Sequence, residues 1–464
     1  MTNVDFKEAP KAKSLPERIR ELRALMAAFS VRPIDPTNPA DARRYFPFHK
    51  EPGRPRGRDP IQDLRNTILL LPETETCQIF SGFQGTGKST ELRRLSLELQ
   101  EQGFPVLFVE GASYINIYEP LEISDLLLGV AAAVGELLQA RLGKSPLERT
   151  LGEHLIEFFS RIKLTQIDVG LSAAMGLGPH APEAKIDVAK LRLELSQNPA
   201  FKAKVQDAFR GSLRVFFDAF SAFMRKAREL FGGEAGPCPV LIVDDLEKIQ
   251  GSGQQQDHVQ RQIEQVFSAF SHALKIDGWH TIWASPPYLP FLNTAIAQQY
   301  DAYVLLPMVR LWDETDPARK PVTEGLSAMR KFLRLRGDVD SLVQSEALLD
   351  ELIVVSSGHV RDLCRLMQDV LRDVVSQDDP NEPLGPAVVR QIVNDYVAGA
   401  QRAVYTDDLP FLRVVADTRR AVLSSGAHVL RVAKLFDTQL VMIYRNGGEW
   451  FDVSVPVQRL LAAG

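Results

Sequence analysis

The sequence predicts an α/β fold in which a parallel sheet carries helices on both faces, followed by a helical lid and a C-terminal winged helix. Two observations support this prediction. Short apolar segments alternate with helical stretches over residues 59–320, and such alternation is typical of a parallel sheet covered on both faces. From residue 321 the pattern becomes helical and closes with two segments of alternating hydrophobicity. Helices closed by a hairpin are the layout of a winged helix.

The first 58 residues are expected to hold one helix and a loop. Ser14 and Glu17 have the spacing of a capping box, and apolar residues follow at helical spacing. Residues 31–58 are rich in proline, which favours a loop that lies over the core. Pro60 suits the first turn of a second helix that runs to about residue 71.

Five short apolar segments are the expected strands of the sheet, within a core at 59–320. Each is long enough for a buried strand and too short for a typical helix. They lie at 77–81, 105–110, 240–244, 281–285 and 302–306. Residues 143–236 interrupt the alternation and predict an insertion of helices and a hairpin, the hairpin strands being 165–173 and 185–195.

The last third of the chain is expected to form two helical units. The lid, at 321–384, has helical patterns near 323–336, 345–356 and 358–376. The winged helix, at 385–464, has helical patterns near 386–401, 409–424 and 427–436. Its hairpin pairs 439–444 with 450–455 through the turn signal Arg445-Asn446-Gly447-Gly448.

Composition places limits on the class of protein. The chain has 464 residues and a formal net charge of −5, which argues against a protein coated in nucleic acid. Its three cysteines, Cys77, Cys238 and Cys364, form neither a metal-ligand spacing nor an even disulfide set. The first residues lack an apolar signal core and no apolar run is long enough to cross a bilayer. We therefore expect a cytoplasmic protein with no membrane partner.

A phosphate-binding loop follows the first strand. Gly82, Gly87, Lys88 and Ser89 occupy the fixed positions of G-x-x-x-x-G-K-[ST]. Such a backbone can curl around a polyphosphate with its N–H groups pointing inward, at the N-terminus of a helix. Lys88 would reach the β- and γ-phosphates of ATP, and the Ser89 hydroxyl would ligate Mg²⁺. The expected nucleotide-binding residues are Gly82, Phe83, Gln84, Gly85, Thr86, Gly87, Lys88, Ser89 and Thr90.

The third predicted strand ends in acidic residues. Four apolar residues precede Asp244, so its carboxylate should lie at the carboxyl end of a buried strand, beside the phosphate loop. We assign Asp244 to Mg²⁺ through water, and Asp245 to orienting or deprotonating the attacking water, with Glu247 as the second candidate. The alternative is that Asp244 and Asp245 only cap the next helix.

Two further residues are candidates for sensing the nucleotide. Ser285 ends the fourth strand, where a polar side chain can contact the γ-phosphate; the alternative is an ordinary strand end before two prolines. Arg361 lies early in a lid helix and could contact the β- or γ-phosphate when the lid closes over the site. The alternative for Arg361 is a solvated side chain.

The ordered set of these motifs, with a winged helix after them, resembles the AAA+/STAND group of P-loop ATPases, including origin-recognition-like and KAP-like members. The resemblance covers about 40–464 and implies a P-loop NTPase core with ATP and Mg²⁺ as cofactors. Arg56-Gly57-Arg58 looks like the short Gly-Arg element of that group, which implies adenine contacts by the backbone around Gly57. Ring motors of the group carry an arginine finger, but 288–300 contains no arginine. Arg310 is the nearest substitute.

These features favour a slow ATP-binding and ATP-hydrolysing switch or assembly ATPase. It would self-associate or act on a separate effector protein, as the nucleotide-sensing component of a bacterial anti-phage or stress system. The alternative is a DNA-binding AAA+ loader that uses its winged helix. Residues 402–464 contain eight Lys and Arg against six acids, a weak excess for phosphate binding. A third hypothesis is a P-loop kinase, for which a basic substrate-clamping loop is missing.

Overall fold

The computed structural model describes most of the chain. The described residues are 13–142, 197–200, 202–203, 206, 213–232, 236–249, 256–422 and 429–463. The predicted hairpin at 165–173 and 185–195 lies outside them, as does most of the predicted insertion at 143–236.

The core is one five-stranded parallel sheet. Its strands are β1 (Cys77–Gly82), β2 (Val106–Glu110), β3 (Val240–Asp244), β4 (His280–Ser285) and β5 (Ala302–Leu306), in the order β2-β3-β4-β1-β5. Because all five strands are parallel, their carboxyl ends meet at one edge of the sheet, where ligands of open α/β sheets bind. This arrangement, with the phosphate loop after β1, is the P-loop NTPase fold and confirms the predicted fold class.

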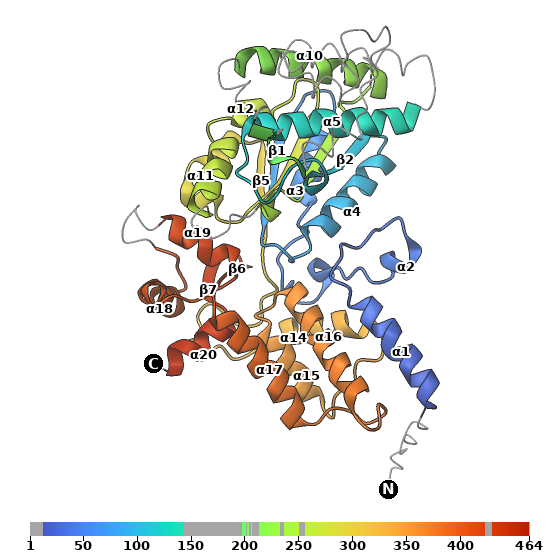
Figure 1. Cartoon of the computed structure of the whole chain (residues 1–464), viewed down its shortest axis with the longest axis vertical. Helices are drawn as coiled ribbons and strands as arrows, with labels where there is room; N and C mark the ends of the chain where they lie inside the picture. The colour runs from blue at the N-terminus through green and yellow to red at the C-terminus, as the bar shows by residue number, and fades with distance from the viewer. Residues whose placement is uncertain are drawn as a thin grey trace.

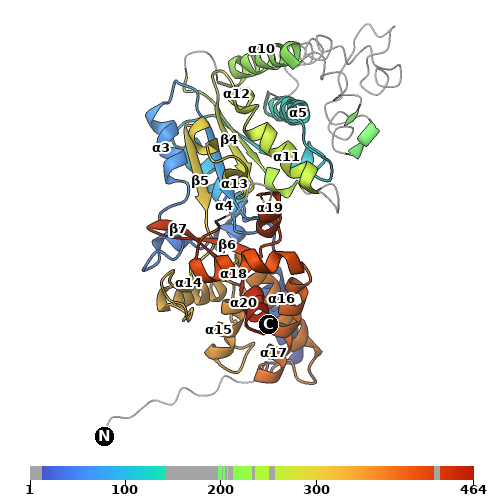
Figure 2. The same cartoon turned by 90° about the vertical axis from the view of Figure 1, so that its left-hand side faces the viewer.

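Helices cover both faces of the sheet, as Figure 2 shows. On one face lie α3 (Gln62–Leu70) and α4 (Lys88–Glu101), and on the other α5 (Ile123–Leu142), α10 (Leu213–Gly232) and α11 (Gln256–Phe267). Successive strand side chains point to opposite faces. Phe80 therefore packs with the α3 and α4 side, and Ile79 with the other side. Each such buried side chain contributes about 1.5–3 kcal/mol.

Short elements fill the connections of the core. They are α2 (Pro39–Ala42), α12 (Ser271–Leu274), α13 (Leu289–Leu292), and the 3₁₀ turns η1 (Phe48–Lys50), η2 (Gly111–Ser113), η4 (Leu246–Lys248) and η6 (Ile296–Gln299). Of these, η1 and η4 matter for function, since they bring Phe48 and Glu247 to the edge of the sheet where the phosphate loop lies.

The lid lies below the sheet in Figure 1. It consists of α14 (Thr323–Arg334), α15 (Glu346–Val355) and α16 (Val360–Ser376), and α1 (Leu15–Ala28) lies beside α16. The buried Arg18 of α1 donates to Pro380 O, in the loop that follows α16, at 3.0 Å. Next, α17 (Pro386–Gln401) packs against α15 and α16 as well as against the last helix, α20 (Val455–Ala463). The predicted boundary near residue 385 thus falls between helices that are in contact.

The C-terminal segment, residues 402–463, combines helices with one hairpin. Its elements are η7 (Thr406–Asp408), α18 (Leu409–Thr418), α19 (Val429–Asp437), the antiparallel strands β6 (Val441–Asn446) and β7 (Gly448–Val453), and α20. A hairpin forms where the sequence predicts one, but its strands extend two residues further into the predicted turn, so that Arg445 and Asn446 belong to β6, and α20 was not expected. The winged-helix assignment stays a prediction.

A buried ionic cluster fastens the C-terminal segment to the chain that leaves the sheet. Asp452, which is 0% exposed, accepts hydrogen bonds from Trp312 Nε1 at 3.0 Å, Arg319 Nε at 2.9 Å and Arg419 at 3.1 Å. Three donors compensate for the desolvation of one carboxylate. Trp312 and Arg319 lie between β5 and α14, so the cluster ties the connection between sheet and lid to β7.

No helix in the part of the chain that the structure describes combines the length and the apolar character needed to span a bilayer.

Candidate functional site

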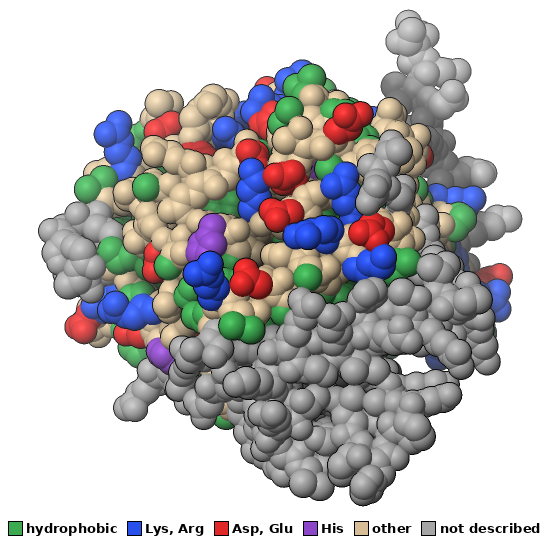
Figure 3. Space-filling view, turned by 90° about the horizontal axis from the view of Figure 1, so that it is seen from above, with side chains coloured by type: hydrophobic (Ala, Val, Ile, Leu, Met, Phe, Trp, Pro, Cys, Tyr) green, Lys and Arg blue, Asp and Glu red, His purple; other side chains and the backbone are tan. Residues whose placement is uncertain are grey.

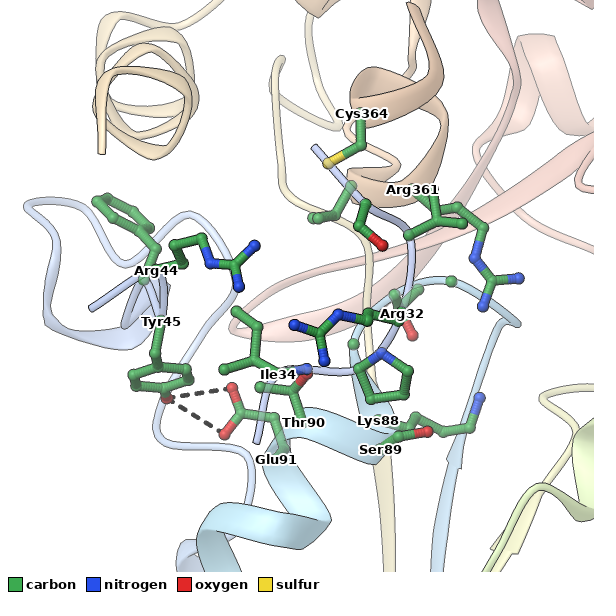
Figure 4. A pocket seen from close by; sticks show the side chains of 18 of the residues that line it. Arg32, Ile34, Arg44, Tyr45, Lys88, Ser89, Thr90, Glu91, Arg361 and Cys364 are labelled. Carbon is green, nitrogen blue, oxygen red and sulfur yellow. Dashed lines mark hydrogen bonds between the residues drawn. The ribbon is translucent and has the colours of Figure 1, made fainter. Parts of the chain in front are cut away.

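A cavity of about 460 Å³ opens at the carboxyl edge of the sheet (Figure 4). Four parts of the chain line it: the phosphate loop with the start of α4, the N-terminal segment from Ala28 to Arg56, the turn η4, and the lid between Phe332 and Cys364. Figure 4 shows Lys88 and Ser89 at the lower right and Arg361 at the upper right, with Ile34 to the left of them, toward Tyr45. This volume falls within the range typical of small-molecule sites.

The phosphate loop requires its glycines. Gly82, Gly85 and Gly87 have φ values of 151°, 93° and 103°, a range that side-chain-bearing residues rarely adopt. A Cβ on Gly82 would lie 2.9 Å from Leu306 O, and one on Gly85 would lie 2.7 Å from the Arg361 Cβ. The loop therefore approaches both β5 and the lid more closely than a side chain would allow.

Lys88 is held inside the loop. Its Nζ donates to Gly82 O at 2.7 Å and to Phe83 O at 2.9 Å, and lies 3.0 Å from Glu247 Oε1. The side chain is 2% exposed. Because Lys88 already pairs with a carboxylate, we expect a bound polyphosphate to replace Glu247 as its anionic partner.

Three carboxylates gather beside Lys88, as the sequence predicts for Asp244, Asp245 and Glu247. Their oxygen atoms lie within 4.8 Å of one another, and all three residues are buried. Burial, followed by the charges of Glu247 and Asp245, raises the pKa of Asp244 to about 7, although a hydrogen bond from Ser89 opposes the rise. Asp244 Oδ1 has no partner among the described residues. Crowded carboxylate oxygens beside a hydroxyl fit Mg²⁺.

Asp245 has an unusual backbone. Its φ of 72° places it in the left-handed region, which aspartate tolerates better than most residues. Its carboxylate pairs with Lys248 Nζ at 2.5 Å, one turn later in η4. The Asp245 carboxylate therefore lies beside Glu247, is partly neutralised by Lys248, and is not among the groups that line the cavity.

The two predicted sensors differ in placement. Arg361 lines the cavity, and its Nε would lie 2.9 Å from a Cβ on Gly85. Burial lowers the pKa of Arg361. Ser285 is 0% exposed at the end of β4, paired with Ser81 of β1 across the sheet, and is not among the residues that line the cavity.

The cavity does not include Gly57, the residue predicted to contact adenine through its backbone. The preceding residue, Arg56, does line it. Arg56 is 7% exposed, its guanidinium lies 5.0 Å from the centre of the Phe48 ring, and it donates to Thr86 O at 2.8 Å. Arg310, the substitute for an arginine finger, is itself buried and paired with Asp313.

The apolar end of the cavity was not predicted from the sequence. Its residues come from segments before the phosphate loop and from the lid. Its lining residues are Val31, Ile34, Tyr45, Phe46, Phe48, Phe332, Val360 and Cys364. Arg336 lies 3.6 Å from the centre of the Phe332 ring, and Tyr45 OH donates to Glu91 at 3.2 Å, as Figure 4 shows. Aromatic side chains provide flat surfaces on which a nucleobase can stack. The run Tyr45-Phe46-Pro47-Phe48 was the available signal in the sequence.

No protein-family model matches this sequence, and no curated protein matches it. Solved structures share its overall arrangement only distantly. The Walker-type ATPase PABY2304 of Pyrococcus abyssi aligns at 12% identity and a TM-score of 0.38, over 94% of this chain and 100% of that one. Cdc6p from Pyrobaculum aerophilum aligns at 11% identity and a TM-score of 0.37, over 94% and 96%.

Proposed function

We propose that this chain is an ATP-binding and ATP-hydrolysing switch of the AAA+ type. The observation that supports it is one cavity lined by the phosphate loop, Glu247 and the lid residue Arg361, with the carboxylates of Asp244 and Asp245 clustered around that of Glu247. The base would lie at the aromatic end. Lys88 and the loop N–H groups would hold the β- and γ-phosphates, Ser89 and Asp244 would hold Mg²⁺, and Asp245 would orient the attacking water. When bound, Mg²⁺ supplies charge neutralisation on the phosphates.

The contacts of Arg361 favour a switch over a constitutive motor. Arg361 belongs to α16 of the lid and lies directly against Gly85 of the loop. A change at the γ-phosphate would therefore alter the contacts of α16, and α16 also contacts α17 and α1. Arg310 pairs within its own chain, which leaves it poorly suited to act on a neighbour's nucleotide. Nucleotide state would thus act as a signal for self-association or for a separate effector protein.

The biological setting is proposed from the sequence resemblance: a bacterial anti-phage or stress system in which this chain senses the nucleotide. A DNA-binding loader is the second candidate, and the charges of the C-terminal segment argue against it. Arg419 pairs with Asp452, Arg431 pairs with Asp408, and Lys434 lies 3.8 Å from the centre of the Tyr405 ring. Figure 3 shows a different face, the one above the sheet, and there too basic and acidic side chains are intermixed. Titration of duplex DNA at two salt concentrations separates the candidates, because steep salt dependence marks phosphate binding.

Light scattering with two nucleotides tests the proposed function. We expect the wild-type protein to differ in mass or shape between ADP and a slowly hydrolysed ATP analogue. Arg361→Ala should bind ATP with only a few-fold loss, because other groups hold the phosphates, but should lose that difference. Arg372→Ala is the matched control, since Arg372 lies on the same helix and is largely exposed.

Two outcomes would contradict the proposal in different ways. Absence of ATP binding by the wild-type protein would remove the ATPase assignment. An unchanged nucleotide response in Arg361→Ala would leave the ATPase intact but would show that Arg361 does not transmit the nucleotide state.

A further inference from the structure

Side chains from outside the phosphate loop bind its backbone carbonyls. Gln84 O lies 3.0 Å from His359 Nε2 of the lid and also accepts from Gln439 Nε2 at 3.0 Å. Thr86 O accepts from Arg56 at 2.8 Å. These three donors come from three regions that are distant in the sequence: the N-terminal segment, the lid and the C-terminal segment.

The hydrogen bonds fix the direction of two peptide planes. The described peptide bonds are all trans, so the C=O of one residue and the N–H of the next point in opposite directions. Gln84 and Thr86 direct their carbonyls outward, to the three donors, and the N–H groups of Gly85 and Gly87 must then point the other way. By contrast, Gly82 and Phe83 direct their carbonyls at Lys88, which marks the inner side of the loop.

The two inward N–H groups are available for a ligand. Among the described residues, neither Gly85 N nor Gly87 N donates a hydrogen bond to the protein. Backbone N–H groups that converge in such a loop form an anion-binding concavity. Their aim decides how well they reach phosphate oxygens, and preorganised donors bind more tightly than donors that must first be ordered.

We propose that Arg56, His359 and Gln439 are positioning residues that aim the Gly85 and Gly87 N–H groups at the polyphosphate, and that Gln439 makes nucleotide affinity depend on the seating of the C-terminal segment. The inference rests on the proposed nucleotide site and adds a form of regulation to it. The contacts that these residues make with the loop are to its backbone carbonyls, so we expect their effect to be exerted through the backbone.

Gln439 is the regulated member of the three because its own position depends on packing. It lies between α19 and β6 with a φ of 58°, a conformation that is unfavourable for glutamine. Three residues earlier, Phe436 packs on Phe83 of the phosphate loop with ring centres 5.7 Å apart, and on Phe291 at 5.0 Å. Movement of α19 away from the core would withdraw Gln439 and Phe436 from the loop together.

Nucleotide binding by full-length variants tests the proposal. Gln439→Met keeps the length of the side chain and removes its donor without adding charge. We expect this substitution to lower the affinities for ATP and ADP about three- to tenfold, which is the effect of one lost hydrogen bond. The affinity for AMP should not change, because AMP has no β-phosphate. Competition against a fluorescent ATP analogue measures all three affinities. Gln458→Met is the matched control, because Gln458 donates the same kind of bond to Val453 O, away from the loop.

Two substitutions of His359 distinguish the loss of one hydrogen bond from misfolding of the variant. His359→Gln keeps a donor for Gln84 O and should retain most ATP affinity, whereas His359→Leu removes the donor and should lose it several-fold. Equal loss for ATP, ADP and AMP in the Gln439 and His359→Leu variants would overturn the proposal, since it would indicate a general structural role. ATP affinity equal to that of the Gln458 control would overturn it as well. Absence of ATP binding by the wild type would instead refute the proposed function.

Discussion

The two ends of the cavity are built in opposite ways. The end proposed for the phosphates comes from one contiguous loop, Gly82–Thr90, whose backbone N–H groups would make the contacts. The end proposed for the base comes from segments near Ile34, Phe48, Phe332 and Val360, whose side chains would make the contacts. A function performed by backbone groups leaves a fixed glycine spacing in the sequence, because only glycine adopts the required φ. A function performed by side chains from distant segments becomes visible only after folding.

The largest expected effect is at the phosphate end. Lys88→Ala removes the one side chain that contacts Gly82, Phe83 and Glu247 at once. We expect at least about a 100-fold loss of ATP affinity, because charge-assisted hydrogen bonds to phosphate are lost. Isothermal titration calorimetry measures it, with the exposed Lys331→Ala as control. ATP binding of wild-type strength would show that the cavity is not a phosphate site.

The next test of the phosphate end separates ATP hydrolysis from ATP binding. Asp245→Asn should retain ATP affinity within a few-fold and lower turnover by about 100-fold or more, because the amide cannot accept a proton. Glu247→Gln is the comparison, since Glu247 is the partner of Lys88 in the free protein. If steady-state hydrolysis falls in Glu247→Gln and not in Asp245→Asn, then the water-activating role belongs to Glu247.

The base end should respond more weakly and without regard to phosphate number. Ile34→Ala shortens an apolar side chain that lines the cavity. We expect ATP, ADP and AMP affinities to fall together by about three- to tenfold, from the apolar surface lost. Competition binding gives the three values, and the exposed Leu70→Ala serves as control. A loss confined to ATP would place Ile34 at the phosphate end instead.

The smallest effect concerns the packing of α19 beside the phosphate end. Burial raises the pKa of Asp437 from its ordinary value of 3.8 to about 7, although hydrogen bonds from Gln260 and Gln256 oppose the rise. Between pH 4 and pH 7 the folded protein therefore binds a proton that the unfolded chain releases. The free energy of unfolding should decrease as pH rises through this range and level off above it.

Asp437→Asn should remove that slope and raise the melting temperature at pH 8 more than at pH 5. Scanning calorimetry at the two pH values measures the change, and Asp407→Asn, whose side chain is 84% exposed, is the control. An equal shift at both pH values would show that Asp437 does not titrate in this range.

The sheet and the phosphate end were predictable because local patterns specify them. Four apolar residues before Asp244 place a carboxylate at a strand end wherever the chain goes next. The pairing of Glu247 with Lys88 was not predictable, because it depends on the turn η4, which brings two residues 159 positions apart into contact. Phe332 and Cys364 were equally hidden, since they reach the cavity only when the lid docks. Ser285 lay at the predicted strand end, yet strand position alone could not show whether its side chain reaches the cavity.

The buried cluster around Asp452 bears on how the protein is made. Arg319 precedes its partner Asp452 by 133 residues, and a ribosome needs roughly 7 to 27 s to add that many. The strands of the sheet and the phosphate loop have all been synthesised before this interval begins. During this interval Trp312 and Arg319 lack the Asp452 carboxylate that accepts their hydrogen bonds in the complete protein. A newly made chain thus has its phosphate loop several seconds before the segment that seats against it, and nascent chains halted before residue 452 offer a way to observe the loop alone.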